Sequence, residues 1–329
     1  MVARLVTRAA VAAAVLVAIA TMAAASAPPD LVARPKRPFE GDGTSRVRTE
    51  SARFPRYATG ADDVRVRLDR PPRRIVSTDS QADEFLASIV PPERLAGLSA
   101  TAFEPRASNV LGLVNARGLV VAANAEAILS ATPDLVVSAM STPAEQVGLL
   151  RHTGVPVYRL FTMLDTLEAI EAHIRLFGYL TGEDTRAALE AGRFRDAITR
   201  AAAMRPANAP APRVLGIGGA YSYGQRTLFT DILRRLGAEN VAATHGLIGY
   251  DRVGPEQIAH WDPDWIVAGA PPGREQAMRE QLLRQPAIAA TRAAARGQIV
   301  VLDNRVFLPL SPYTARLVEQ LAGTLFGAR

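Results

Sequence analysis

The sequence predicts an α/β protein made of two Rossmann-like lobes with parallel sheets, joined by a long rigid helix. Three observations indicate this fold class. Short apolar runs alternate with segments of helical period in two separate series. A long helical region lies between the series, and one short sequence element occurs once in each. With 329 residues and 48% hydrophobic composition, the chain can bury a core in each lobe.

The N-terminus is typical of a secretory signal peptide, expected over residues 1–27. Arg4 and Arg8 precede an uncharged, Ala-rich run over 9–25 that is short for a membrane span, and small residues follow it. We therefore expect Sec export to the periplasm, and no lipid anchor, because the chain has no cysteine. Residues 28–54 are rich in Pro, Arg, Gly and Ser and are expected to form a flexible leader.

The first α/β lobe is expected over residues 55–165. Val64, Val66 and Leu68 alternate with charged residues and predict an edge strand. Later apolar runs predict buried strands, and the stretches between them predict helices. The predicted strands cover 75–77, 95–98, 135–137 and 155–160. The predicted helices cover 81–89, a short helix that Asn124 caps and that ends before Pro133, and 143–152.

The connecting region, residues 166–205, is expected to be helical. Residues 167–180 are amphipathic, and Thr181 is expected to cap a second helix that has Glu183 and Asp184 in its first turn. A helix running on to Met204 would be about 30 Å long. Such a helix is expected to act as a rigid spine between the lobes.

The second lobe, residues 206–329, repeats the alternation. Its predicted strands cover 214–217, 266–268 and 299–302. Its predicted helices cover 227–236, which should end at Gly237, and 312–326.

Composition excludes several classes of function. Lys36 is the only lysine, so no Walker A loop, pyridoxal phosphate site or Ser-x-x-Lys hydrolase can be built in the folded lobes. Without cysteine there are no disulfides, thiolate metal sites or cysteine nucleophiles. Acids and bases are interspersed despite the net charge of +6, so nucleic acid is not an expected partner. No metal site is expected either, because the histidines lack ligand spacing; they are His152, His173, His245 and His260.

The repeated element contains a glutamate, an isoleucine and a Pro-Asp pair, and its second copy lies 130 residues after the first. Each series also begins with an arginine before an apolar run, Arg74 and Arg213. Each glutamate lies in the first turn of a predicted short helix, where a negative charge is favourable on its own. Matched positions in both lobes favour a further role, which is docking onto a partner with two basic pockets. The matched residues are Glu126, Ile128, Pro133 and Asp134, and Glu256, Ile258, Pro263 and Asp264.

These stretches resemble the helical-backbone (class III) periplasmic binding proteins, which serve ABC importers of ferric siderophores, haem and cobalamin. The resembling segments are 71–77, 126–128, 133–137, 154–157, 254–258 and 263–264, and the resemblance extends over about residues 55–329. It implies a monomer that binds a small-molecule metal chelate and docks Glu126 and Glu256 onto arginines of an inner-membrane ABC permease. A ferric siderophore is the first expectation, with haem and cobalamin as alternatives, and no resident cofactor or catalytic residue is expected. A periplasmic sensor and a chelatase-like enzyme remain alternatives from other classes.

In such a fold the ligand lies at the carboxyl ends of the strands. Gly219 to Arg226 is the strongest candidate segment, because two tyrosines can stack on a flat ligand or ligate iron. Arg226 and Arg305 can pair with carboxylates of a chelate. The full set of expected ligand-binding residues is Thr78, Asp79, Gln81, Phe103, Ser141, Tyr221, Tyr223, Arg226, Tyr250, Arg305 and Phe307.

Overall fold

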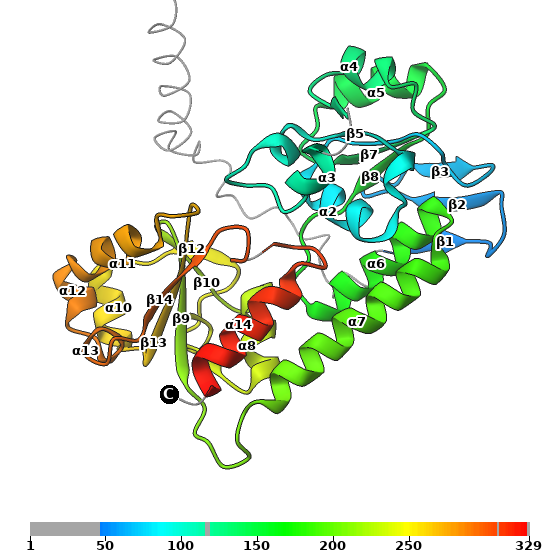
Figure 1. Ribbon diagram of the computed structural model, residues 1–329. Helices are drawn as coiled ribbons and strands as arrows, with labels where there is room; N and C mark the ends of the chain where they lie inside the picture. Colours follow the sequence, from blue (N-terminus) through cyan, green and yellow to red (C-terminus); the bar gives the residue numbers. More distant parts are fainter. Residues whose placement is uncertain (1–46, 116–118, 308, 328–329) are drawn as a thin grey trace, which may run out of the picture. The chain divides into compact units, whose positions relative to one another are not determined.

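The computed structural model describes residues 47–115, 119–307 and 309–327, which lie within one compact unit (Figure 1). The predicted signal peptide and residues 28–46 of the predicted leader lie outside the described residues. Among the described residues, no helix has the length and apolar character needed to cross a bilayer.

A small antiparallel sheet precedes the first lobe. It contains β1 (Arg48–Glu50), β2 (Arg56–Thr59) and β3 (Arg65–Leu68), in that order. The edge strand expected around Val66 is therefore confirmed. The expectation of a flexible leader is wrong for residues 48–50, because they pair with β2. All three side chains of β1 are exposed, so the strand is specified by main-chain pairing and leaves no apolar period in the sequence.

The first lobe contains a fully parallel sheet with the order β6-β5-β4-β7-β8. Helix α2 packs on one face together with the connecting helices, and α4 and α5 lie over the other. The predicted strands and helices are all present; β6, α3 and the two 3₁₀ turns were not predicted. The strands are β4 (Ile75–Ser77), β5 (Leu95–Leu98), β6 (Val120–Val121), β7 (Leu135–Ala139) and β8 (Val157–Leu160), and the helices are α2 (Ser80–Ile89), η3 (Pro92–Arg94), η4 (Ala100–Phe103), α3 (Leu111–Asn115), α4 (Ala125–Ser130) and α5 (Ala144–His152).

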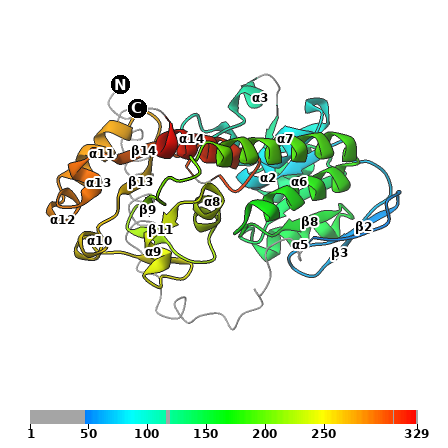
Figure 2. The same ribbon diagram turned by 90° about the horizontal axis from the view of Figure 1, so that it is seen from below.

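The connecting helices α6 (Leu167–Thr181) and α7 (Asp184–Ala203) form a tight helical hairpin. Thr181 does not cap α7, which corrects the prediction: it belongs to α6, and its hydroxyl donates to the Phe177 carbonyl at 2.7 Å. Gly182 ends α6 in the left-handed region (φ 75°), a conformation that glycine adopts without a steric penalty. Figures 1 and 2 show α7 alongside α6 and next to α14, and α7 also contacts α2 and α8.

The second lobe contains a sheet with the order β12-β10-β9-β13-β14, in which β11 also pairs with β9. Strands β9, β11, β13 and β14 are parallel, as expected, but β10 and β12 are antiparallel and extend one edge. The strands are β9 (Arg213–Gly218), β10 (Tyr221–Tyr223), β11 (Glu239–Asn240), β12 (Tyr250–Arg252), β13 (Trp265–Ala270) and β14 (Ile299–Asp303). The helices are α8 (Leu228–Leu236), α9 (Val241–Thr244), α10 (Pro255–Trp261), α11 (Glu275–Leu283), α12 (Pro286–Ala289), α13 (Arg292–Ala295) and α14 (Thr314–Phe326).

One apolar core passes through both lobes. It joins Leu135 of the first sheet and Val267 of the second through residues of α2, α6, α7, α8 and α14. Separate clusters fill the outer face of each sheet, below α4 and α5 in the first lobe and below α10 to α13 in the second. The connecting helices are therefore part of the main core, which limits how independently the lobes can move.

The repeated element forms the same local structure in both lobes. Helix α4 leads into β7 through Thr132 (φ 43°), and α10 leads into β13 through Asp262 (φ 44°). The Asp134 carboxylate accepts hydrogen bonds from the Arg73 and Arg74 amides, and the Asp264 carboxylate accepts one from the Arg213 amide. This agreement supports the sequence repeat as one structural unit used twice.

Candidate functional site

Hydroxyl groups gather at the carboxyl ends of β4 and β7 in the first lobe. The hydroxyls of Thr78 and Thr142 lie 3.2 Å apart, and Ser141 beside them is exposed. The buried side chain of Arg159 holds this loop, since its Nη2 donates to three carbonyls, those of Ala139, Met140 and Thr142. Arg159 was not among the predicted site residues, although a charged residue inside an apolar strand could have indicated it.

Three other predicted site residues of the first lobe are engaged in structural contacts. Asp79 caps α2, with its carboxylate accepting from the amides of Gln81 and Ala82, and burial raises its pKa. The Gln81 amide donates to the Leu310 carbonyl at 2.7 Å. Phe103 is half-buried against the small cluster around Leu98. The contact of Gln81 with Leu310 joins segments far apart in sequence, so the local pattern did not show it, whereas the cap formed by Asp79 is local.

The second lobe presents an aromatic β-ribbon. Residues 221–223, expected in a loop, form strand β10, which follows a tight turn at Gly219 and pairs with β12. Tyr223 faces Tyr250 across the ribbon with their rings 5.6 Å apart, and the Arg252 guanidinium lies 5.6 Å from the Tyr221 ring centre. Tyr221 is 46% exposed and Tyr250 45% exposed. The ribbon therefore offers two accessible rings and a cation on one face.

Tyr223 and Phe307 form the support below that surface. Both are 8% exposed, and Tyr223 packs against Phe229, Tyr250 and Phe307. Burial raises the pKa of Tyr223, which disfavours the phenolate that would ligate iron. A Cβ at Gly218 would lie 2.1 Å from the Tyr223 hydroxyl, so only glycine leaves room for this ring. Tyr223 is suited to positioning Tyr250 on the ribbon.

The pKa of Tyr250 is influenced by a residue of the segment that follows the first sheet. Burial raises the pKa of its phenol, and the negative charge of Asp165 raises it further. Asp165 lies between β8 and α6, so a charge from outside the second lobe influences the Tyr250 phenol.

The two predicted arginines differ in their environments. Arg305 is paired with Asp303 at 2.5 Å, and this partner raises the pKa of Arg305 while Arg305 lowers the pKa of Asp303. Arg226 is exposed and has a positive φ of 60°. Arg252, which the sequence reasoning missed, lies beside the exposed tyrosines. Its place opposite Tyr221 depends on the pairing of β10 with β12, and no local pattern reveals that register.

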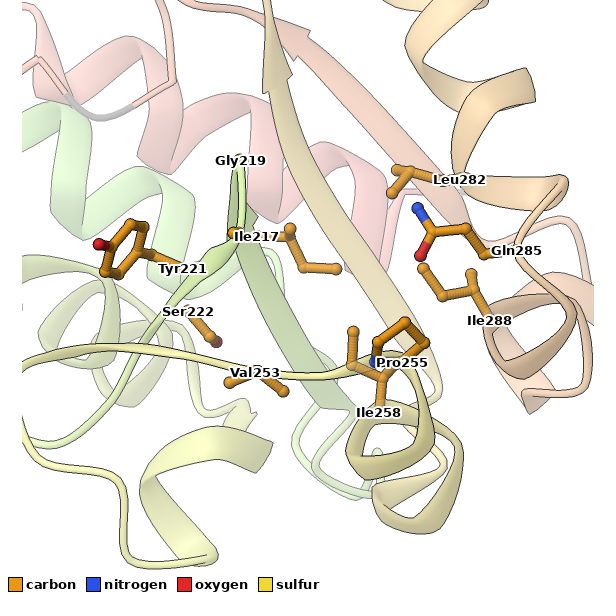
Figure 3. A pocket seen from close by; sticks show the side chains of 11 residues that line it. Ile217, Gly219, Tyr221, Ser222, Val253, Pro255, Ile258, Leu282, Gln285 and Ile288 are labelled. Atoms are coloured by element: carbon orange, nitrogen blue, oxygen red, sulfur yellow. The ribbon is translucent and has the colours of Figure 1, made fainter. Parts of the chain in front are cut away.

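A pocket of about 270 Å³ lies on the other face of the ribbon, under α10 to α12 (Figure 3). Apolar side chains such as Ile217, Leu282 and Ile288 line it, together with the amide of Gln285, and the Tyr221 ring points away from them. Ligand pockets usually measure about 300–1,000 Å³. This pocket is therefore small for a whole chelate, and the exposed aromatic face remains the better candidate surface.

Glu126 and Glu256 are both exposed, in the first turns of α4 and α10. Neither carboxylate forms an ion pair with any of the residues described by the structure. A negative charge in the first turn of a helix contributes only about 0.3–1 kcal/mol. Both groups are therefore available to a partner.

Within the described ranges, no three His, Cys, Asp or Glu side chains come together as a metal site. His173 is buried in α6, burial lowers its pKa to about 4, and its ring nitrogen contacts the Ala169 carbonyl. His245 stacks on Trp261 at 5.1 Å. Both histidines thus have packing contacts that explain their positions.

Comparison with known proteins places this architecture among binding proteins. The sequence profile of a family described as periplasmic binding proteins matches residues 75–306. A cobalamin-binding protein of Halobacterium salinarum is 26% identical over 82% of this chain and 73% of its own length. A periplasmic heme-binding protein of Pseudomonas aeruginosa is 27% identical, with a TM-score of 0.65 over 78% of this chain and 94% of the other. The Fe³⁺-hydroxamate transport protein of Saccharomonospora viridis has a TM-score of 0.66 at 22% identity, over 84% of this chain and 100% of that one, and shows the shared fold.

Proposed function

The chain belongs to the periplasmic binding protein family, and we propose that it is the receptor of an ABC importer for a metal chelate. A metal tetrapyrrole, cobalamin or haem, is the leading cargo, and a ferric siderophore is the second candidate. The receptor would bind the chelate in the periplasm and deliver it to an inner-membrane permease. The family and its named relatives are binding proteins, which supports this role over catalysis.

The observation that carries the proposal is the ribbon face formed by Tyr221, Tyr250 and Arg252. Two accessible rings on one face suit stacking on a flat macrocycle, and the guanidinium suits its carboxylate or phosphate groups. The two relatives named above with more than 25% identity bind cobalamin and heme, and each has a tetrapyrrole-type cargo. Both lines of support change the order of the cargoes expected from the sequence, where the siderophore came first.

The first lobe would contribute polar contacts to the same ligand. Thr78 and Ser141 lie at the carboxyl ends of neighbouring strands, where hydroxyls can bind the polar rim of a chelate. Tyr223 and Phe307 would hold the ribbon from below without contacting metal. The proposed cleft therefore pairs a polar side with an aromatic side.

Glu126 and Glu256 would contact basic residues of the permease. Exposed ion pairs are each worth about 0–1 kcal/mol, so these groups would mainly orient the loaded receptor during docking. Their matched positions in the two lobes support a partner that engages both lobes at once. Glu256 follows Pro255 directly, and Pro255 starts α10 rigidly.

The test is isothermal titration calorimetry of the purified protein with haemin, cobalamin, ferric citrate, a ferric hydroxamate and a ferric catecholate. We expect one tetrapyrrole to bind at micromolar or lower concentration, and Tyr250→Ala to weaken that binding. A Tyr57→Ala variant, in the small antiparallel sheet, is the matched control and should bind normally. Tight binding of a siderophore alone would replace the cargo, and no binding by any of the five would contradict the receptor role.

A further inference from the structure

A segment near the C-terminus ties the second lobe back to the first. After β14 the chain reaches α2 of the first lobe with residues 309–314, here called the return segment. The Leu310 carbonyl accepts from Gln81 at 2.7 Å, and the Ser311 hydroxyl donates to the Glu84 carboxylate. Tyr313 packs against the first-lobe cluster that contains Leu98 and Val110. The lobes are thus attached at a place well separated from α7 in the sequence.

Glu84 is the centre of this attachment. It is only 9% exposed, and each of its two oxygens has a partner. Oε2 accepts from Ser311, and Oε1 accepts from the Asn109 side-chain amide at 2.7 Å. The same Asn109 amide donates to the Arg305 carbonyl at 2.9 Å. Glu84 therefore fixes residues that precede and follow Phe307 in the sequence, Arg305 through Asn109 and Ser311 directly. Phe307 is the buried support of the aromatic ribbon.

The surroundings of Glu84 act in opposite directions on the ionised form of its carboxylate. Burial raises its pKa, whereas the hydrogen bonds from Ser311 and Asn109 and the nearby charge of Arg316 act in the opposite direction. A buried carboxylate usually stabilises a fold less than an apolar side chain of similar size does. The exception is a carboxylate whose buried hydrogen-bond donors would lose their acceptor without it. Here the partners are fixed donors on segments of both lobes, which gives the group a geometric role.

We infer that Glu84 is a positioning residue for the ligand cleft, acting through Ser311 and Asn109 on the segment that carries Arg305 and Phe307. It fixes this segment, and with it the aromatic ribbon, relative to the hydroxyl groups of the first lobe. The expected effect on chelate affinity rests on the proposed function, whereas the expected effect on the relative position of the lobes does not. The connecting helices and the shared core already join the lobes, and the Glu84 contacts add an attachment that is distant from the connecting helices in the sequence.

A fixed orientation has a direct consequence for affinity. When only a fraction of molecules has the binding geometry, the apparent dissociation constant rises by the inverse of that fraction. Loss of the Glu84 contacts should reduce the binding-competent fraction and weaken the chelate affinity by roughly tenfold. The glutamine variant keeps the shape, accepts from Asn109 and donates to Ser311, so it should preserve the geometry.

The test measures the distance between the lobes and the affinity in the same variants. The chain contains no cysteine, so Leu149→Cys on α5 and Gln281→Cys on α11 can carry spin labels for double electron–electron resonance. We expect a narrow distance distribution in the parent protein and in Glu84→Gln, and a broad one in Glu84→Ala. Glu104→Ala, an exposed first-lobe carboxylate, is the matched control and should leave both readouts unchanged.

The outcomes separate this inference from the proposed function. A narrow distribution in Glu84→Ala overturns the inference, and so does a broad distribution with unchanged chelate affinity. Should Glu84→Ala fail to fold, Ser311→Ala removes the same contact and takes its place under the same criteria. If the parent protein binds no chelate, the proposed function fails, while the distance measurement still decides whether Glu84 fixes the lobes.

Discussion

The two lobes are most alike where a short helix leads into a buried strand, α4 into β7 in the first lobe and α10 into β13 in the second. They are least alike at the carboxyl ends of their strands. Asp134 and Asp264 each secure the start of the first strand of their lobe by accepting from main-chain amides. At the strand ends, the first lobe carries Thr78 and Ser141 and the second carries an added antiparallel ribbon. The shared part suits a role common to both lobes, and the different parts suit contact with one asymmetric ligand.

A second comparison concerns buried carboxylates at equivalent helix positions. Asp83 is the fourth residue of α2, and Asp231 is the fourth residue of α8. Asp231 pairs with Arg234 and accepts from the Leu167 amide. Asp83 accepts from the Ser99 amide and hydroxyl, and burial raises its pKa to about 7. The first lobe therefore contains a pH-sensitive group where the second contains an ion pair.

The largest expected effect tests the shared scaffold. Asp134→Ala leaves the Arg73 and Arg74 amides without their acceptor, and hydrogen bonds to a charged group are worth about 1.5–3 kcal/mol. We expect a loss of about 3 kcal/mol in the free energy of unfolding, measured with urea. Asp264→Ala should cost a comparable amount, since it loses the Arg213 amide and two ion pairs, with Arg292 and Arg296.

The control for this pair is Asp196→Ala on the exposed side of α7, which should change stability little. A strong loss for one aspartate and none for the other would show that the repeated element stabilises only one lobe. That result would break the structural equivalence of the two lobes.

The next effect concerns Asp83. A pKa raised in the folded state gives stability that is complete below the unfolded pKa and is lost as the pH rises through the folded pKa. For Asp83 the window runs from the ordinary aspartate value up to about 7. Relative to Asp83→Asn, the unaltered protein should lose about 2–3 kcal/mol of unfolding free energy between pH 5 and pH 8.5.

Urea unfolding at both pH values measures this difference. The asparagine side chain can still accept from the Ser99 amide but does not titrate. The free energy of unfolding of Asp83→Asn should therefore change less between the two pH values. Parallel pH dependence in both proteins would assign the effect to other groups, among which Glu84 and Asp79 also have raised pKa values.

The smallest of these effects compares the two sides of the proposed cleft. Tyr221→Ala or Tyr250→Ala removes an exposed ring from the ribbon and should weaken chelate binding roughly tenfold, about 1.4 kcal/mol. Thr78→Ala should weaken it only about threefold, because one neutral hydrogen bond contributes less. Calorimetry with the bound chelate measures both. A larger loss for Thr78→Ala than for either tyrosine would place the main binding surface in the first lobe.

The arrangement of buried strands and main helices could be predicted because local patterns decide it. The apolar runs at 75–77 and 135–137 became central strands, and Asn124, Thr227 and Gly237 formed the expected helix ends. Strand β1 could not be predicted, since its side chains are all exposed. Thr181 has a residue type that favours capping, but the helix continues through it until Gly182 can adopt a positive φ.

The candidate site could be predicted less well, because its contacts depend on partners distant in sequence. Gln81 lies where the strand end suggested, yet it is bonded to the distant Leu310. Arg305, by contrast, is paired with the neighbouring Asp303. Arg252 reaches Tyr221 through the register of two antiparallel strands, which no short pattern encodes. The sequence identified the segments that bear the site, and the tertiary structure showed which side chains of those segments are exposed.

The most direct measurement of the central claim is transport by the importer reconstituted in proteoliposomes with its permease and ATPase. The receptor would be supplied as the unaltered protein, as Glu126→Ala, as Glu256→Ala and as the double variant, each with the same bound chelate. We expect similar moderate losses of uptake in the two single variants, a loss of at least roughly tenfold in the double variant, and unchanged chelate affinity in all of them. Normal uptake by the double variant would contradict docking through the two matched lobes.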